Sequence, residues 1–252
     1  PILISGLGRY EYGIWVTIGQ MAAFLLVADL GVANSIGRLV AKYDAIKSTD
    51  QKNKIYSTSL AILILVMIVI VAFSLMFLNY IPEGLGIKNE YKDIVVTVFI
   101  IMLINVSLSF PLRIGRGLLQ AVHRFDTIDI ILTIIKILQL IFIFILFYFY
   151  DMSLINLALL ISVTNISADL IIFIKSYRAH KGINFNFKFI SKISAKEIFS
   201  MGGASVLLST SGVLTNQGFI FLVSFILGVM YAPLLSVPVL LLLPIGALIG
   251  KI

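Results

Sequence analysis

The sequence contains no cysteine and only two histidines among its 252 residues. Without thiols the chain forms no disulfide and offers no thiolate metal site. The histidines, His123 and His180, stand in polar stretches without a cluster of carboxylates around them. A metal centre and a Ser-His-Asp arrangement therefore both lack their residues. We expect no metal ligand, no cofactor and no enzymatic activity.

Charge is also scarce, because only 12% of the residues are charged while 60% are hydrophobic. Soluble domains carry about 25% charged residues, so this composition excludes a soluble enzyme. No glycine-rich phosphate loop follows a strand, which argues against direct use of ATP. A bilayer-spanning helix needs about 20 apolar residues, and the chain is long enough to hold several of them.

Seven apolar runs of spanning length are separated by glycine, proline and charged residues. They cover residues 13–40, 56–78, 94–110, 128–148, 154–174, 198–227 and 233–249. Each run is about twice as long as a membrane strand of about ten residues and does not alternate in polarity. The sequence therefore predicts an all-α fold, a polytopic membrane helix bundle with seven transmembrane helices.

The positive charges are unevenly divided between the two ends of these helices. Fifteen of the 19 Lys and Arg residues fall on one side, and only Arg9, Lys88 and Lys92 fall on the other. Such an excess marks the cytoplasmic side of a membrane protein. The net charge of +7 thus reflects topology, and we expect a lipid bilayer as the partner and no nucleic acid.

The long polar stretch after the fifth span suggests a division into two lobes. We expect residues 1–175 to form an N-terminal lobe that lacks its first helix, and 176–197 to be a cytoplasmic loop between the lobes. Residues 198–252 would begin a truncated C-terminal lobe. An even number of spans in the first lobe would give parallel repeats about an axis along the membrane normal.

Polar side chains within the spans are the candidate functional residues, because burying them in a bilayer is costly. On one helical wheel, Gln20, Asn34 and Arg38 share a face of the first span, whereas Asp29 lies opposite. This polar face either joins neighbouring helices or lines a water-filled path.

Lys136 lies deep inside the fourth span, too far from its end for easy snorkelling. Two interpretations remain open: it forms a structural chain with Asp129 or Gln139, or it faces a central cavity and attracts an anion. Asp169 has two candidate partners, Lys175 and Lys136. In the sixth span, small and polar residues recur every three or four positions up to Asn216, a pattern of close packing or of cavity lining.

Four segments resemble the polysaccharide-export and oligosaccharide flippase family. Residues 7–15 (LGRYEYGIW) are similar to its outside turn, and 28–38 (ADLGVANSIGR) to its second helix, which ends in Asp-Leu-Gly and a basic residue. Residues 118–126 (LLQAVHRFD) resemble its turn between helices four and five, and 215–217 (TNQ) the late part of helix seven. The order of these segments agrees with helices two to eight of a two-lobe transporter of 12–14 helices.

The resemblance implies a multi-pass protein of the bacterial inner membrane that flips undecaprenyl-diphosphate-linked oligosaccharides by alternating access. Such transport serves O-antigen, lipopolysaccharide or capsule synthesis, with glycan polymerase machinery as a further partner. A cationic lumen is then expected, and the candidate substrate-binding residues are Gln20, Asn34, Arg38, Lys136 and Asn216. An exporter of drugs or small molecules from the same superfamily is the alternative, with a more aromatic lumen. A membrane glycan polymerase, an acyltransferase or a scaffold would be a function of another class.

Overall fold

The structure, a computed structural model, describes residues 2–29, 31–150, 152–180 and 182–239, where all regular elements are helical. The α-helices are α1 (Ile2–Leu26), α2 (Val32–Ala45), α3 (Thr49–Phe77), α4 (Ile81–Gly84), α5 (Lys92–Leu112), α6 (Ile114–Ala121), α7 (Phe125–Phe149), α8 (Leu154–Ala179), α9 (Lys192–Val213) and α10 (Phe219–Leu227). Short turns join them: η1 (Val27–Asp29), η2 (Leu78–Tyr80), η3 (Asn89–Tyr91), η4 (Phe187–Phe189), η5 (Leu214–Gly218) and η6 (Val229–Tyr231). The predicted all-α class is confirmed.

Six helical stretches are long and apolar enough to cross a bilayer, and they correspond to the first six predicted spans. They are Leu3–Ala45, Thr49–Gly84, Asn89–Ala121, Phe125–Phe149, Leu154–Ala179 and Ser205–Leu227. A shorter apolar helix, Val229–Val239, overlaps the start of the seventh predicted span, 233–249. The rest of that prediction lies outside the described residues. The chain is a multi-pass membrane protein.

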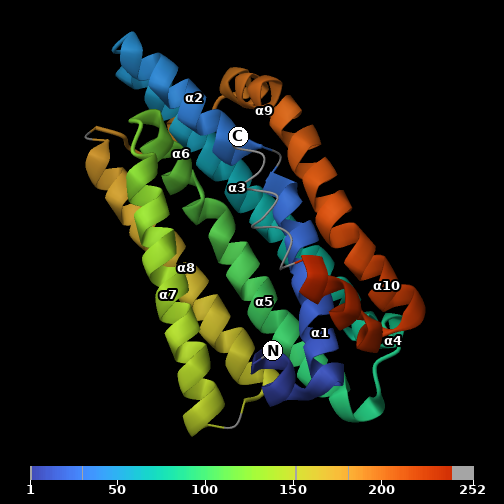
Figure 1. Cartoon of the computed structure of the whole chain (residues 1–252). Helices are drawn as coiled ribbons and strands as arrows, with labels where there is room; N and C mark the ends of the chain where they lie inside the picture. Colours follow the sequence, from blue (N-terminus) through green and yellow to red (C-terminus); the bar gives the residue numbers. More distant parts are fainter. Residues whose placement is uncertain (1, 30, 151, 181, 240–252) are drawn as a thin grey trace.

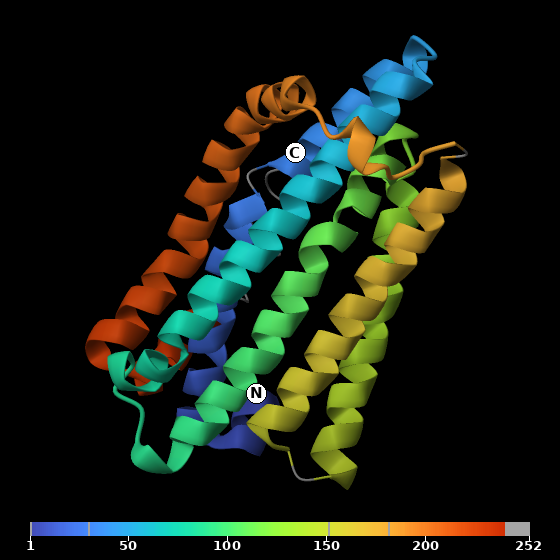
Figure 2. The ribbon, with the colours of Figure 1, turned by 180° about the vertical axis from the view of Figure 1, so that it is seen from behind.

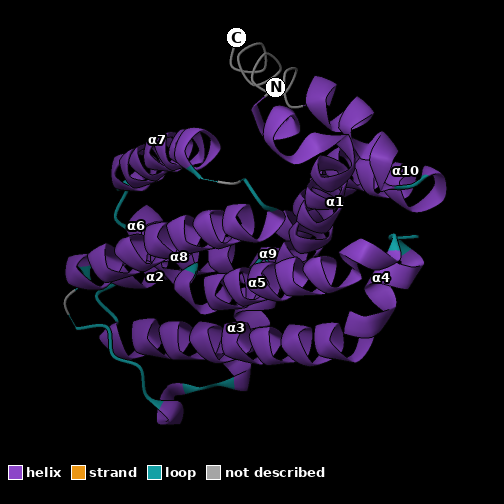
Figure 3. Ribbon diagram, turned by 90° about the horizontal axis from the view of Figure 1, so that it is seen from below, coloured by secondary structure: helices purple, strands orange, loops and turns teal. Residues whose placement is uncertain are grey.

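The helices form an elongated bundle in which α7 and α10 lie on opposite sides (Figure 1). Helix α5 packs against α3 and α8, and α7 packs on the outer side of α8 (Figures 2 and 3). Helix α9 packs on α2 and α3. The ends of α2, α6 and α8 and the starts of α3, α7 and α9 gather at one end of the bundle, which we call the basic end.

The first span is not one continuous helix. Helix α1 ends at Leu26, and α2 starts only after Gly31, which adopts a left-handed conformation with φ of 69°. Side chains other than glycine rarely take this conformation. Gly31 also lies against α9, because a Cβ atom added to it would be 2.7 Å from the carbonyl oxygen of Gly202. The break therefore fixes both the direction of α2 and its contact with α9.

Two glycines bring α2 and α6 into close contact. A Cβ atom added to Gly117 would overlap Ile36 and lie 2.7 Å from the carbonyl oxygen of Ala33. A Cβ atom added to Gly37 would lie 3.0 Å from the carbonyl oxygen of Gly117. Small residues allow membrane helices to approach so closely that backbone atoms touch. Helix α6 is therefore seated firmly on α2.

The polar connection predicted at 176–197 is shorter than expected, because α8 continues to Ala179 and α9 already begins at Lys192. The connection lies against the first turns of α3, whose buried polar side chains accept hydrogen bonds from its backbone. The N–H groups of residues 184, 186 and 191 bond to Asn53, Ser57 and Thr58 at 3.0, 3.2 and 3.1 Å. These bonds explain why polar side chains are buried at that end of α3.

Candidate functional site

A polar cavity of about 280 Å³ lies between the break in the first span, α6 and α9. We call it the arginine pocket. Its walls are formed by Asp29, Ala33, Asn34, Arg113, Arg116, Gln120 and Ser209. Few polar side chains are expected within the spans of a membrane protein, and those present tend to line a cavity or meet a partner. The arginine pocket is therefore the leading candidate site in the described part of the chain.

Arg113 is held at the break between α1 and α2. Its Nη1 donates to Asp29 Oδ2 at 3.2 Å and to the carbonyl oxygen of Leu26 at 3.4 Å. The other carboxylate oxygen of Asp29 accepts from the N–H of Gly31 at 2.9 Å. The carbonyl groups at a helix end lack intrahelical partners, so Arg113 compensates both the charge of Asp29 and the end of α1.

Arg116 is paired with a carboxylate on α8. Its Nη2 donates to Asp169 Oδ1 at 2.6 Å, and Ser109 Oγ donates to Asp169 Oδ2 at 2.9 Å. Asp169 is only 4% exposed, and neither expected partner, Lys175 or Lys136, bonds to it in the described residues. The Nε group of Arg116 is buried and has no hydrogen-bond partner there. Arg116 thus retains an unused donor while its Nη2 holds α6 against α8.

Arg38 extends this polar surface along α2 toward the basic end. It lies one turn after Asn34, and its Nη2 donates to the carbonyl oxygen of Met201 at 3.0 Å and to Ser205 Oγ at 3.3 Å. Both partners are on α9, and Ser205 is one turn from Ser209. No carboxylate pairs with Arg38 in the described residues. Three guanidinium groups therefore face two aspartates in this region, an excess of one positive charge.

A second contact between α2 and α9 lies closer to the basic end. The Glu197 carboxylate accepts from Lys42 Nζ at 2.7 Å and from the Tyr43 hydroxyl at 2.8 Å. Partial burial raises the pKa of Glu197, but the hydrogen bonds from Lys42 and Tyr43 and the charge of Lys42 outweigh it. The pKa of Glu197 therefore lies below its ordinary value, and the group is ionised at neutral pH.

The five predicted substrate-binding residues do not converge on one cavity. Asn34 lines the arginine pocket, and Arg38 contacts α9 beside it. Gln20 lines a different cavity, described below, because the break at η1 changes the course of the chain. The single helical wheel was wrong for the same reason, since Asp29 lies in the same pocket as Asn34. Asn216 is exposed in the π-helical turn η5, where Nδ2 donates to the carbonyl oxygen of Gly212 at 2.8 Å.

Lys136 belongs to a polar cluster between α7 and α8. Its Nζ donates to Gln139 Oε1 at 2.9 Å and lies 3.4 Å from Asn165 Oδ1. Gln139 Nε2 in turn donates to Thr164 Oγ1 at 2.9 Å. Of the two interpretations, the structure favours the chain with Gln139. Asp129 is not part of it, and Lys136 lies outside the arginine pocket.

Arg113, Arg116 and Gln120 were not singled out by sequence reasoning, because the arginines were assigned to a cytoplasmic loop. The structure places them on or beside the short helix α6. Their spacing of three and four residues, interleaved with Ile114 and Leu118, is the pattern of an amphipathic helix. That signal was present in the sequence.

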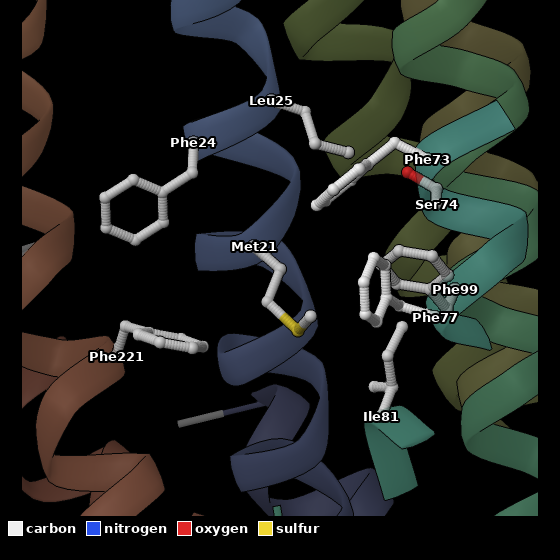
Figure 4. Close-up of a pocket in the computed structure, with 9 residues that line it drawn as sticks. All are labelled: Met21, Phe24, Leu25, Phe73, Ser74, Phe77, Ile81, Phe99 and Phe221. Carbon is white, nitrogen blue, oxygen red and sulfur yellow. The ribbon is translucent and has the colours of Figure 1, made fainter. Parts of the chain in front are cut away.

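An apolar cavity of about 240 Å³ lies between α1, α3, α4, α5 and α10 (Figure 4). We call it the phenylalanine pocket. It is lined by Met21, Phe24, Leu25, Phe73, Ser74, Phe77, Ile81, Phe99 and Phe221. The side chains in Figure 4 come from both sides of α1, and Ser74 carries the only polar side chain among them. Such a surface suits an apolar molecule and offers no group that binds a charge.

Among the described residues there is no group of three or more His, Asp or Glu side chains that could hold a metal ion. The arginine pocket contains guanidinium, amide and hydroxyl groups, and the one carboxylate among its described lining residues, Asp29, is paired with Arg113. Guanidinium, amide and hydroxyl groups donate hydrogen bonds to anions and to oxygen-rich ligands.

Comparison with known proteins shows the family to which the chain belongs. A search of curated proteins finds no match. A solved structure, the inward-facing conformation of a multidrug resistance MATE family transporter of the MOP superfamily, has a similar fold with a TM-score of 0.66. The two share 16% identity, and the match covers 89% of this chain but 55% of the transporter, so this chain spans about half of that protein's length. The profile of the polysaccharide biosynthesis protein family matches residues 1–247, and the chain therefore belongs to that family.

Proposed function

We propose that this chain is part of a flippase that moves lipid-linked, undecaprenyl-diphosphate oligosaccharides across the bacterial inner membrane. It would do so by alternating access, with residues 1–175 and 198–252 in two different lobes and 176–197 between them. Family membership supports a role in polysaccharide synthesis, and the fold supports transport. Glycan polymerase machinery would receive the flipped units. The product of the pathway, O-antigen or capsule, would depend on which glycan the host strain makes.

The arginine pocket is the observation that carries this proposal. A diphosphate is recognised best by guanidinium groups, which present several N–H donors in a plane. Arg113 and Arg116 line the pocket, and Arg38 adds a cation that no carboxylate balances among the described residues. The buried, unpartnered Nε of Arg116 is a donor available to a phosphate oxygen. Asn34, Gln120 and Ser209 add uncharged polar groups.

The test is complementation of a deletion strain, with lipid-linked repeat units quantified in the cytoplasmic leaflet. We expect the deletion to strand repeat units there and Arg38→Gln to restore flipping poorly. Unaltered surface polysaccharide in the deletion strain would overturn the proposal. Arg116→Gln alone leaves Asp169 unpaired, so the double variant Arg116→Gln/Asp169→Asn is the better probe. It should be folded and inactive, whereas Lys47→Gln at the exposed basic end should be active.

A second candidate is an exporter of apolar drugs or small molecules, which the phenylalanine pocket favours. Its five phenylalanines surround a cavity without charge. If this function is the main one, Phe99→Ala should lower resistance to uncharged lipophilic drugs and leave surface polysaccharide unchanged. If the chain is a dedicated flippase, the same variant should leave drug resistance unchanged.

A further inference from the structure

A third cavity, of about 350 Å³, lies between α1, η5, α10 and the short apolar helix Val229–Val239. We call it the amide pocket, because Gln20 of α1 and Gln217 of η5 both line it. We infer that it is a binding site for an uncharged, hydroxyl-rich ring, that is, for a sugar of the transported molecule. This inference rests on the proposed function and adds to it a site separate from the arginine pocket.

Two polar atoms in this cavity lack partners in the described residues. Gln20 Oε1 and Ser236 Oγ are both buried without a hydrogen bond, and Ser236 is only 3% exposed. Buried polar groups in native proteins are nearly always paired, so such orphans point to a ligand or to water. The cavity is far larger than the volume of one water molecule and falls within the range of small-molecule sites.

The lining also indicates the chemistry of the ligand. The described residues of the lining include no charged side chain, so beside them a phosphate or a sugar acid would be buried without a counter-charge. A lipid chain would leave the amide and hydroxyl groups unpaired. A sugar ring has both donors and acceptors for Gln20, Gln217 and Ser236, while its apolar face can lie on an aromatic ring such as Trp15. Gly19 leaves space beside them, because an added Cβ atom would meet nothing within 4 Å.

The two polar cavities are arranged along the same pair of spans. Gln20 precedes Asp29 by nine residues, and Gln217 follows Ser209 by eight, so each separation is roughly 12–14 Å along a helix. A ligand that reaches from the arginine pocket toward the amide pocket would remain between these two spans. A diphosphate followed by sugars has this order of charged and uncharged groups.

Trp15 makes the inference testable, because it is the only tryptophan in the chain and lines the amide pocket. The experiment uses the full-length protein in lipid nanodiscs, with any tryptophan other than Trp15 replaced by phenylalanine. Trp15 emission is recorded during titration with undecaprenyl diphosphate that carries the native repeat unit. The same lipid without sugar is the reference. We expect a saturable emission shift with the first lipid only.

Variants then separate the pocket from the rest of the protein. Gln20→Leu and Ser236→Ala should each raise the half-saturating concentration about tenfold, the factor that one lost hydrogen bond gives. Gly19→Leu should abolish the shift by filling the cavity. The matched controls are Gln51→Leu and Gly84→Leu, which lie outside the pocket and have open surroundings, and they should behave like the parent protein.

The possible failures are distinguishable. If both lipids shift the emission equally, or if Gly19→Leu binds like the parent, the amide pocket does not bind the sugar, and the inference is wrong while flipping stands. If the parent protein binds neither lipid and does not flip the repeat unit in the leaflet assay, the proposed function itself is overturned.

Discussion

Glu197 is the single residue through which α9 binds both Lys42 and Tyr43 of α2. Because its pKa is lowered in the folded protein, its contribution to stability is complete above the pKa of the unfolded chain and is lost as the pH falls through the lower folded value. We therefore expect Glu197→Gln to lower the melting temperature at pH 7. The difference should begin to shrink as the pH falls through the ordinary glutamate pKa of about 4.3 and should disappear only below the lower pKa of the folded protein. Thermal unfolding of both proteins in detergent from pH 3 to 8 measures it, and a pH-independent difference would contradict the assignment.

Lys136 and Gln139 should respond differently to substitution, although they are hydrogen-bonded to each other. Removing a lysine charge from the bilayer gains about 2.5–3.5 kcal/mol, while losing a hydrogen bond to a charged group costs about 1.5–3 kcal/mol. Lys136→Met should therefore leave stability nearly unchanged. Gln139→Leu keeps the charge and removes its nearest partner, so it should destabilise the protein by about 1–3 kcal/mol. Melting curves of the two variants measure these changes in stability. Equal losses of stability would contradict the assigned role of Gln139 as the partner of Lys136.

The sequence indicated which polar residues form contacts within the bundle better than it indicated their partners. Lys136 and Gln139 could be matched because they are one helical turn apart on the same helix. Asp169 could not be assigned to Arg116, since the two lie 53 positions apart in sequence and the hydrogen bond depends on how α6 packs against α8. Gln217 and Ser236 likewise became candidates only when the structure brought them into one cavity with Gln20.

At the scale of elements, Gly31 and Gly203 provide a matched pair. An alanine at Gly31 would adopt an unfavourable positive φ, at a cost of about 1–2 kcal/mol, and would also press on the backbone of Gly202. An alanine at Gly203 in α9 meets nothing within 4 Å and should stabilise the helix by about 1 kcal/mol. Thermal melting should fall for Gly31→Ala and rise for Gly203→Ala. A stabilised Gly31→Ala would show that the break is not required.

Helix positions were predictable from apolar runs, whereas helix ends and breaks were not. The run at 13–40 is interrupted by η1 and Gly31, yet glycine alone does not identify a break, since Gly19 and Gly37 lie within regular helix. The left-handed conformation of Gly31 is stabilised by its hydrogen bond to Asp29 and by contact with α9. Both depend on neighbours that a single run of sequence does not reveal.

For the whole molecule, the uneven division of Lys and Arg predicts which end faces the cytoplasm. Lys47 lies at the basic end and Lys88 at the other, and both are exposed. In spheroplasts, a membrane-impermeant thiol reagent should label Lys88→Cys and leave Lys47→Cys unlabelled, and inside-out vesicles should reverse the pattern. The absence of native cysteines in the chain keeps the background low. The opposite pattern would invert the assigned orientation.

A water-filled arginine pocket makes a separate prediction. The thiolate form of cysteine attacks thiol reagents, and a thiolate forms readily only in an aqueous environment. Asn34→Cys and Ser209→Cys should therefore react in the membrane, whereas Ile137→Cys, on the exposed apolar surface of α7, should not. Addition of the lipid-linked repeat unit should protect the first two. If neither pocket position reacts, the cavity is dry and the site must lie elsewhere.

Helix α7 packs mainly on α8 and α6, and most of its side chains are not buried. Inside a bilayer, apolar contact does not favour one face of such a helix over another, because lipid tails are as apolar as leucine. The bonds of Lys136 and Gln139 to α8 occur at only one rotation of α7 about its own axis. The rest of α7 within the bilayer is almost entirely apolar. This cluster therefore fixes the rotation of α7 about its own axis relative to α8.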